Sequence, residues 1–117
     1  MSMIVGETGK KIYAITSVDV STNTSLIIKA VPPSGEDNTK DFTATIDAVG
    51  FASVTLEDGT ASGSVAANES MFYELANTTD LDEAGIWKMV GVWTDTVSNK
   101  IIKGLPFTME VLDDSYG

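Results

Sequence analysis

Residues 80–89 read DLDEAGIWKM, and this stretch says more about the fold than any other part of the chain. It opens with three carboxylates, passes through a glycine, and continues with large apolar residues two positions apart. Successive side chains of a β-strand point to opposite faces, so Trp87 and Met89 fall on the same face. The stretch therefore predicts an acidic corner followed by a strand that buries Trp87 and Met89 in a core.

The same ten residues resemble the corner before strand F of immunoglobulin-like sandwiches, which reads Asp-x-Ala-Gly-x-Tyr-x-Cys. Asp82, Ala84 and Gly85 stand in register with that pattern. Trp87 occupies the tyrosine position, and Met89 occupies the cysteine position. The resemblance implies a packed β-sandwich with these five residues as its core signature, and it argues against most enzyme folds.

Short apolar–polar alternations between clusters of Gly, Asn, Asp and Ser dominate the rest of the chain, and helical spacing is scarce. Strands are expected at 12–16, 25–31, 42–46, 51–56, 71–75, 86–94 and 101–111, with a shorter one at 64–67 and a turn at 95–100. Pro106 requires an edge position or a bulge, because proline cannot donate to the ladder. The pattern predicts an all-β chain of about seven to nine short strands, a number that fits a sandwich. Together with the resemblance of the corner, it leads us to expect an antiparallel immunoglobulin-like β-sandwich.

Composition limits the chain to one domain, residues 1–117, with 43% hydrophobic residues available for a core. The charge is strongly biased, since 17 acidic residues against 7 basic ones give a formal net charge of −10. Such a surface repels phosphate backbones and anionic membranes. We therefore expect neither a nucleic-acid partner nor a membrane partner.

The chain contains no cysteine and no histidine. The first absence removes disulfides, thiolate nucleophiles and the usual structural zinc sites. The second removes the Ser-His-Asp triad and the ordinary imidazole base. A glycosidase would need two carboxyl groups held across a cleft, for which a small sandwich offers little room. We therefore expect a protein that is not an enzyme and that carries no cofactor.

The N-terminal residues 1–7 lack the basic region and apolar run of a signal peptide. No apolar stretch approaches the roughly 20 residues needed to cross a bilayer. These features lead us to expect a protein that is made and assembled in the cytoplasm.

The strand after the corner is apolar on both faces. Ile86, Val90 and Val92 project opposite Trp87, and only Lys88 interrupts them. A half-exposed antiparallel strand would alternate apolar with polar residues. One interpretation is a central strand covered by loops or by the chain's own termini. The other is a partner surface, because exposed apolar patches mark contacts, and we expect Ile86, Val90 and Val92 at or beside a protein–protein interface.

The carboxylates Asp80, Asp82 and Glu83 offer hard oxygen donors of the kind that bind calcium. Their spacing does not match an EF-hand loop, which needs a longer acidic pattern with a glycine and a terminal glutamate. The alternative role is capping of a short helical turn, in which a carboxylate accepts from unpaired amides. We expect no metal site.

Six motifs follow one another along nearly the whole chain: GETG at 6–9, SLIIK at 25–29, PSG at 33–35, FTAT at 42–45, DLDEAGIW at 80–87 and PFTMEV at 106–111. Their order resembles a family of small virion proteins of tailed bacteriophages. That family includes the N-terminal domain of the phage baseplate upper protein and other short immunoglobulin-like tail or head modules.

The resemblance implies a non-enzymatic structural module that binds in multiple copies at a tail, baseplate, collar or fibre-attachment site. Its partners would be other virion proteins, and its location the virion, after assembly in the host cytoplasm. Two alternatives stay open: a capsid decoration (cement) protein on the outer shell, and a carbohydrate-binding module for host attachment. The latter needs exposed aromatic residues, whereas Trp87, Trp93, Phe42 and Phe107 fall on presumed core faces.

Overall fold

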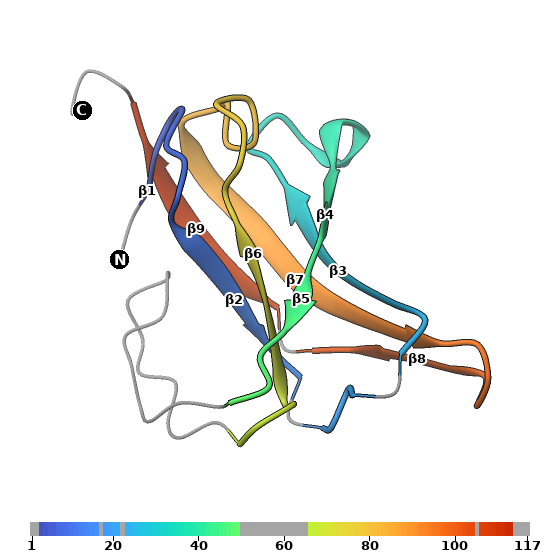
Figure 1. The fold of residues 1–117 in the computed structure, drawn as a ribbon. Coiled ribbons are helices and arrows are strands. Elements are labelled where there is room, and N and C mark those ends of the chain that lie inside the picture. The colour runs from blue at the N-terminus through green and yellow to red at the C-terminus, as the bar shows by residue number, and fades with distance from the viewer. Residues whose placement is uncertain (1–2, 17, 22, 50–65, 105, 114–117) are drawn as a thin grey trace.

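A computed structural model describes residues 3–16, 18–21, 23–49, 66–104 and 106–113 (Figure 1). These residues form nine strands and one short 3-10 helix, η1 (Glu36–Asn38). Within these ranges no helix has the length and apolar character needed to span a bilayer. The part of the chain that the structure describes is therefore almost entirely β-structure and turns.

The larger sheet has the strand order β1–β9–β7–β3–β4, and β8 lies beside the second half of β7. Its strands are β1 (Met3–Ile4), β3 (Ser25–Val31), β4 (Lys40–Thr43), β7 (Gly85–Asp95), β8 (Lys100–Lys103) and β9 (Phe107–Leu112). β1 pairs with β9 in parallel, and the other neighbours pair antiparallel. The sheet is therefore mixed, with β7 and β3 at its centre.

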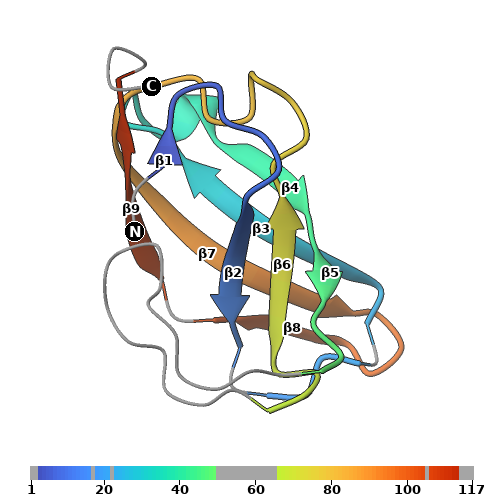
Figure 2. The same ribbon diagram turned by 60° about the vertical axis from the view of Figure 1, so that its left-hand side comes forward.

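The smaller sheet is antiparallel and has the order β2–β6–β5. Its strands are β2 (Lys11–Ile15), β5 (Thr45–Ile46) and β6 (Ser70–Glu74). Figure 2 shows this sheet lying across one face of β7 and β3. The facing side chains make one core, which includes Ile12 and Met71 from the smaller sheet and Ile28, Trp87 and Met109 from the larger one.

The expected strand at 42–46 is divided between the two sheets. β4 pairs with β3 as far as Thr43, and β5 pairs with β6 from Thr45 onward. The amide of Ala44 still donates to the carbonyl of Leu26 at 2.8 Å, which marks the last bond to the larger sheet. Strands that change sheets at a bend are a known way to form the corners of sandwiches.

The expected strand at 101–111 is also divided, into β8 and β9, and Pro106 lies at the break between them. The strand expected at 71–75 is present as β6, one residue earlier. The strand expected at 51–56 lies outside the described residues. Of the short strand expected at 64–67, residues 64 and 65 lie outside the described residues. The expectation is wrong for residues 66 and 67, which are not in a strand: residue 67 belongs to a turn in which Asn68 has a positive φ of 66°.

Candidate functional site: the outer face of the larger sheet

The three residues predicted for an interface all project from β7 on the side away from the core. Trp87 and Met89 point inward and are buried. On the other face, Ile86 is 51% exposed, Val90 is half-buried, and Val92 is only 8% exposed. Of the three, Ile86 is therefore the side chain that a partner reaches most directly.

Neighbouring strands account for the burial of Val92. Its cross-strand partners are Ile27 on β3 and Lys103 on β8. Val90 stands opposite Lys29 in the same way. Long lysine side chains can lay their aliphatic stems over apolar residues while the ammonium group stays in water. These flanking side chains shield Val90 and Val92 from solvent at the centre of the outer face, whereas Ile86 at the end of the face stays more exposed.

Three of the seven lysines of this strongly acidic chain stand on this face, together with the carboxylates of Asp41 and Glu110. Lys29, Lys88 and Lys103 all occupy outward positions, and Lys29 forms an ion pair with Asp41 at 3.3 Å. Among the described residues, Lys88 and Lys103 have no ion-pair partner within 4.0 Å. The face therefore combines apolar side chains with two ammonium groups whose charge the described residues do not pair.

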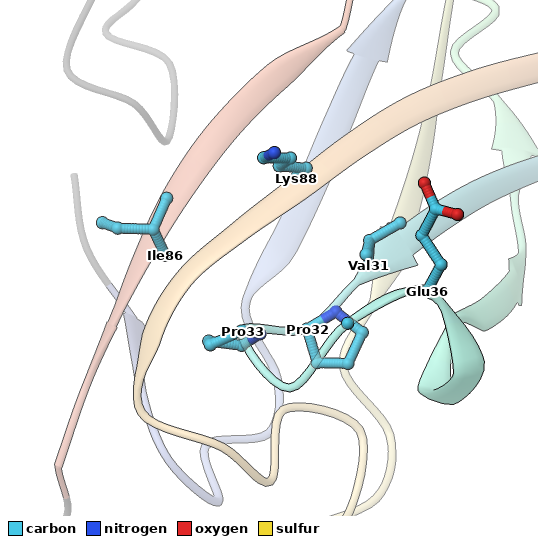
Figure 3. Close-up of a pocket in the computed structure, with 7 residues that line it drawn as sticks. Val31, Pro32, Pro33, Glu36, Ile86 and Lys88 are labelled. Carbon is cyan, nitrogen blue, oxygen red and sulfur yellow. The ribbon is translucent and has the colours of Figure 1, made fainter.

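A hollow of about 230 Å³ opens at the end of this face where β7 begins (Figure 3). It is lined by Val31, Pro32, Pro33, Gly35, Glu36, Ile86 and Lys88. Two prolines and two aliphatic side chains make most of its wall, and Glu36 and Lys88 supply opposite charges. Such a hollow suits an apolar side chain with polar groups around it.

Hydrogen bonds hold the walls of the hollow in place. Pro32 and Pro33 fix the backbone where β3 ends, and the amide of Gly35 donates to the Pro32 carbonyl at 3.0 Å. The amide and hydroxyl of Ser34 both donate to the Glu83 carboxylate, at 3.2 and 2.8 Å. The turn after β3 is thereby tied to the corner before β7. The hollow is preformed, which lowers the entropic cost of filling it.

Gly85 makes the close approach of these two segments possible. Its φ is +129°, a backbone conformation that residues with a Cβ rarely adopt. A Cβ at this position would stand 2.6 Å from Cγ of Pro33. The glycine is therefore required both by its backbone geometry and by the proline that packs against it.

The remaining signature residues lie around this corner. The indole Nε1 of Trp87 donates to the carbonyl of Glu83 at 2.9 Å, which closes the corner from inside. Asp82 forms an ion pair with Lys40 at 3.1 Å. Asp82 and Ala84 are exposed, so only the later part of the signature lies in the core.

The three carboxylates of the corner each have a different partner. Asp80 is buried and accepts from the Tyr73 hydroxyl at 2.8 Å and from the amides of Ala76 and Asn77 at 2.9 and 3.1 Å. Asp82 and Glu83 are held by Lys40 and Ser34 as described above. Across the described ranges, no group of three His, Cys, Asp or Glu side chains is placed to hold a metal ion. The expected capping of a helical turn is wrong: residues 77–84 form turns and bends, and Asp80 accepts from the preceding amides of Ala76 and Asn77 instead of capping a helix.

The pKa values of buried Asp80 and half-buried Tyr73 are both shifted. Burial raises the pKa of Asp80, but hydrogen bonds from the Asn77 amide, the Tyr73 hydroxyl and the Ala76 amide outweigh it and leave the pKa below its ordinary value. Burial, together with the hydrogen bond to Asp80, raises the pKa of Tyr73 to about 12. At neutral pH the carboxylate is ionised and the phenol is neutral.

Asp80→Asn is expected to lower the free energy of unfolding at pH 7 by about 1–3 kcal/mol, because buried donors lose a charged acceptor. A carboxylate with a lowered folded-state pKa stabilises the fold above its unfolded pKa. That contribution disappears as the pH falls through the folded pKa. Urea unfolding at pH 7 and pH 3 should therefore show the difference from wild type shrinking at the lower pH. Asp82→Asn, at an exposed carboxylate, is the control, and an equal loss in both variants would contradict this role of Asp80.

Two features of the surface were not predicted from the sequence. Val97 is 91% exposed at the tip of the β7–β8 hairpin, which was expected only as a turn. Tyr13 and Phe72 lie side by side on the outer face of the smaller sheet, with ring centroids 5.8 Å apart. Their planes are inclined by 47°, and the Lys11 ammonium lies 4.6 Å from the centroid of Phe72. The pair therefore does not form the flat, open platform that stacks on a sugar ring.

The four aromatic residues expected on core faces occupy the interior or its margin. Trp87, Trp93 and Phe42 are buried, and Phe107 is half-buried against the core. No family model, no curated protein and no solved structure matches this chain. The outer face of the larger sheet carries exposed Ile86 and the hollow, and it is therefore the candidate binding surface.

Proposed function

We propose that this chain is a non-enzymatic assembly module, an immunoglobulin-like domain that binds neighbouring proteins through the outer face of its larger sheet. The observation that carries the proposal is Ile86. It stands 51% exposed on the central strand β7 and lines the preformed hollow. Exposed apolar groups beside a concave apolar surface are typical of contact sites.

The order of the strands supports the immunoglobulin-like part of the proposal. Variable-type immunoglobulin sandwiches place strands G, F, C and C′ in one sheet and B, E and D in the other. The orders β9–β7–β3–β4 and β2–β6–β5 agree with that arrangement. A tyrosine near the start of strand F in that fold bonds to backbone a few residues upstream. Trp87 makes the equivalent bond to Glu83.

The hydrogen bonds that fix the hollow and β7 support a role in binding other proteins. Ser34 and Glu83 lock the wall formed by Pro32 and Pro33, and β7 is held on both sides by β3 and β9. A contact surface that is already ordered loses little conformational entropy on binding. Burial of Ile86 and the surrounding wall would then contribute about 25 cal/mol per Å² of apolar surface removed from water.

The setting we propose is the particle of a tailed bacteriophage, as the resemblance of the six motifs implies. There the module would bind in multiple copies to tail, baseplate, collar or fibre proteins, after assembly in the host cytoplasm. A place on the outer capsid shell would use the same face and is the alternative setting. The position of the chain in purified particles separates the two.

Ile86→Asp tests the assembly function in virions whose genome encodes the chain. The side chain is exposed, so we expect the variant to fold and to keep the wild-type melting temperature. Burial of a carboxylate in an apolar contact is costly, so incorporation into purified particles should fall by about tenfold or more. Quantitative mass spectrometry of the particles measures it.

The matched control is Val49→Asp, at a valine that is 86% exposed and lies in the bend after β5 of the smaller sheet. It should be incorporated like the wild type. Equal incorporation of the folded Ile86→Asp variant would overturn the proposed function.

A further inference from the structure

The tip of the β7–β8 hairpin displays an apolar side chain to solvent. Val97 is 91% exposed, more than any other large hydrophobic residue in the described ranges. Its neighbours in the turn, Thr96, Ser98 and Asn99, are polar, so the valine stands alone on a polar loop. We call the exposed Val97 side chain the knob; it is a small apolar group that water solvates poorly.

The tip is held rigid from both sides. The Asp95 carboxylate accepts from the Val97 amide at 3.0 Å and from the Ser98 hydroxyl at 2.6 Å. These bonds, with that of Ser98 first, hold the pKa of Asp95 below its ordinary value, so the carboxylate is ionised at neutral pH. Thr96 is bonded through its amide and hydroxyl to the Thr24 hydroxyl, at 3.0 and 2.8 Å. The knob is therefore presented in one fixed orientation.

The knob and the hollow lie at opposite ends of one strand. β7 begins at Gly85 beside the hollow and ends at Asp95 just before the tip, and its 11 residues extend about 36 Å at the rise of a strand. Figure 1 shows the hairpin at the end of β7 remote from the corner. Val97 and the hollow therefore cannot meet within one molecule, but they can meet between two.

We propose that Val97 of one copy inserts into the hollow of the next copy. This inference rests on the proposed assembly function and names the partner of its site, a second copy of this chain. The hollow of about 230 Å³ has an apolar wall of Val31, Pro33 and Ile86 and is large enough for one aliphatic side chain. Its rim carries Glu36 and Lys88, and exposed Lys100 follows the tip, so Glu36 is the rim group that is opposite in charge to Lys100.

Two antiparallel copies can fill each other's hollows and close a pair, whereas copies arranged in line make the contact head-to-tail. Repetition of such a contact generates a ring or a filament rather than a closed pair. That is the form that many copies around a tail or along a particle surface require. In such an assembly, β7 of each copy would connect the contact at its hollow to the contact at its tip.

Disulfide trapping tests this contact directly, because the chain has no cysteine of its own. Val97→Cys and Ile86→Cys are prepared as two single-cysteine proteins, mixed in equal amounts and oxidised. We expect the mixed disulfide to exceed either homodimer several-fold, since only that pair brings the two sulfur atoms together. Val49→Cys mixed with Ile86→Cys is the control. A mixed yield no higher than the control overturns the proposal.

Sedimentation gives an independent readout that needs no cysteine. Wild-type protein should associate further as its concentration approaches millimolar. Val97→Asp should weaken this association by about tenfold or more, and Val49→Asp should leave it unchanged. A mixture of Val97→Asp and Ile86→Asp should form pairs and nothing larger, because only one knob and one hollow remain intact. A wild type that stays monomeric throughout, or an unaffected Val97→Asp variant, contradicts the proposal.

The outcomes distinguish this inference from the function on which it rests. If trapping fails while Ile86→Asp is still excluded from particles, the outer face binds another protein and the self-contact is wrong. If folded Ile86→Asp enters particles normally, the proposed function itself is wrong.

Discussion

Trp87→Ala is expected to lower the free energy of unfolding by about 3–5 kcal/mol, the range for truncating a large buried aromatic residue. Trp87 is completely buried between the two sheets, and its Nε1 donates to the Glu83 carbonyl at 2.9 Å. The substitution leaves a cavity in the core and also removes the hydrogen bond that closes the corner. Domains of this size are stable by about 5–15 kcal/mol, so the loss is a large share of the total.

Urea unfolding followed by far-ultraviolet circular dichroism measures this loss. Trp87→Phe separates its two causes, because phenylalanine fills much of the space but cannot donate to Glu83. We expect the phenylalanine variant to fall between wild type and Trp87→Ala. An alanine variant as stable as wild type would show that Trp87 does not organise the core.

Gly85→Ala is expected to lower the free energy of unfolding by about 2–6 kcal/mol, because two effects combine. A residue with a Cβ at a φ of +129° is strained by about 1–3 kcal/mol. The new Cβ would also stand 2.6 Å from Cγ of Pro33, and overpacking of this kind costs about 1–3 kcal/mol. The hollow should be distorted in the same variant, since Pro33 is part of its wall.

A double-mutant cycle with Pro33→Ala measures the steric part. Alanine at position 33 removes the Cγ atom that the new methyl would strike. Gly85→Ala should therefore cost less in the Pro33→Ala background than in wild type, while the backbone strain remains. An unchanged cost in both backgrounds would show that the contact with Pro33 plays no part.

Local patterns in the sequence were sufficient for much of the fold. β3 occupies the expected residues 25–31, because its alternation and the prolines that end it are local signals. The all-β character follows from the same kind of pattern. The sheet change at Ala44 could not be predicted in this way. It depends on β4 pairing with β3 and β5 pairing with β6, which are distant in sequence.

The candidate site was only partly predictable for the same reason. The apolar outward positions of β7 singled out Ile86, but the burial of Val92 depends on Ile27 and Lys103 from other strands. The hollow depends on a turn after β3 that Ser34 and Glu83 fix to the corner. No local pattern shows that these segments meet.

Lysine footprinting of the free and assembled chain is the most direct test of the claim that the outer face of the larger sheet is the contact surface. Lys88 and Lys103 lie on that face, whereas Lys10 precedes β2 and Lys11 begins it, in the other sheet. Acetylation measured by mass spectrometry should show Lys88 and Lys103 losing most of their reactivity on assembly while Lys10 and Lys11 keep theirs. Protection of Lys10 and Lys11, with Lys88 and Lys103 as reactive as in the free chain, would contradict it.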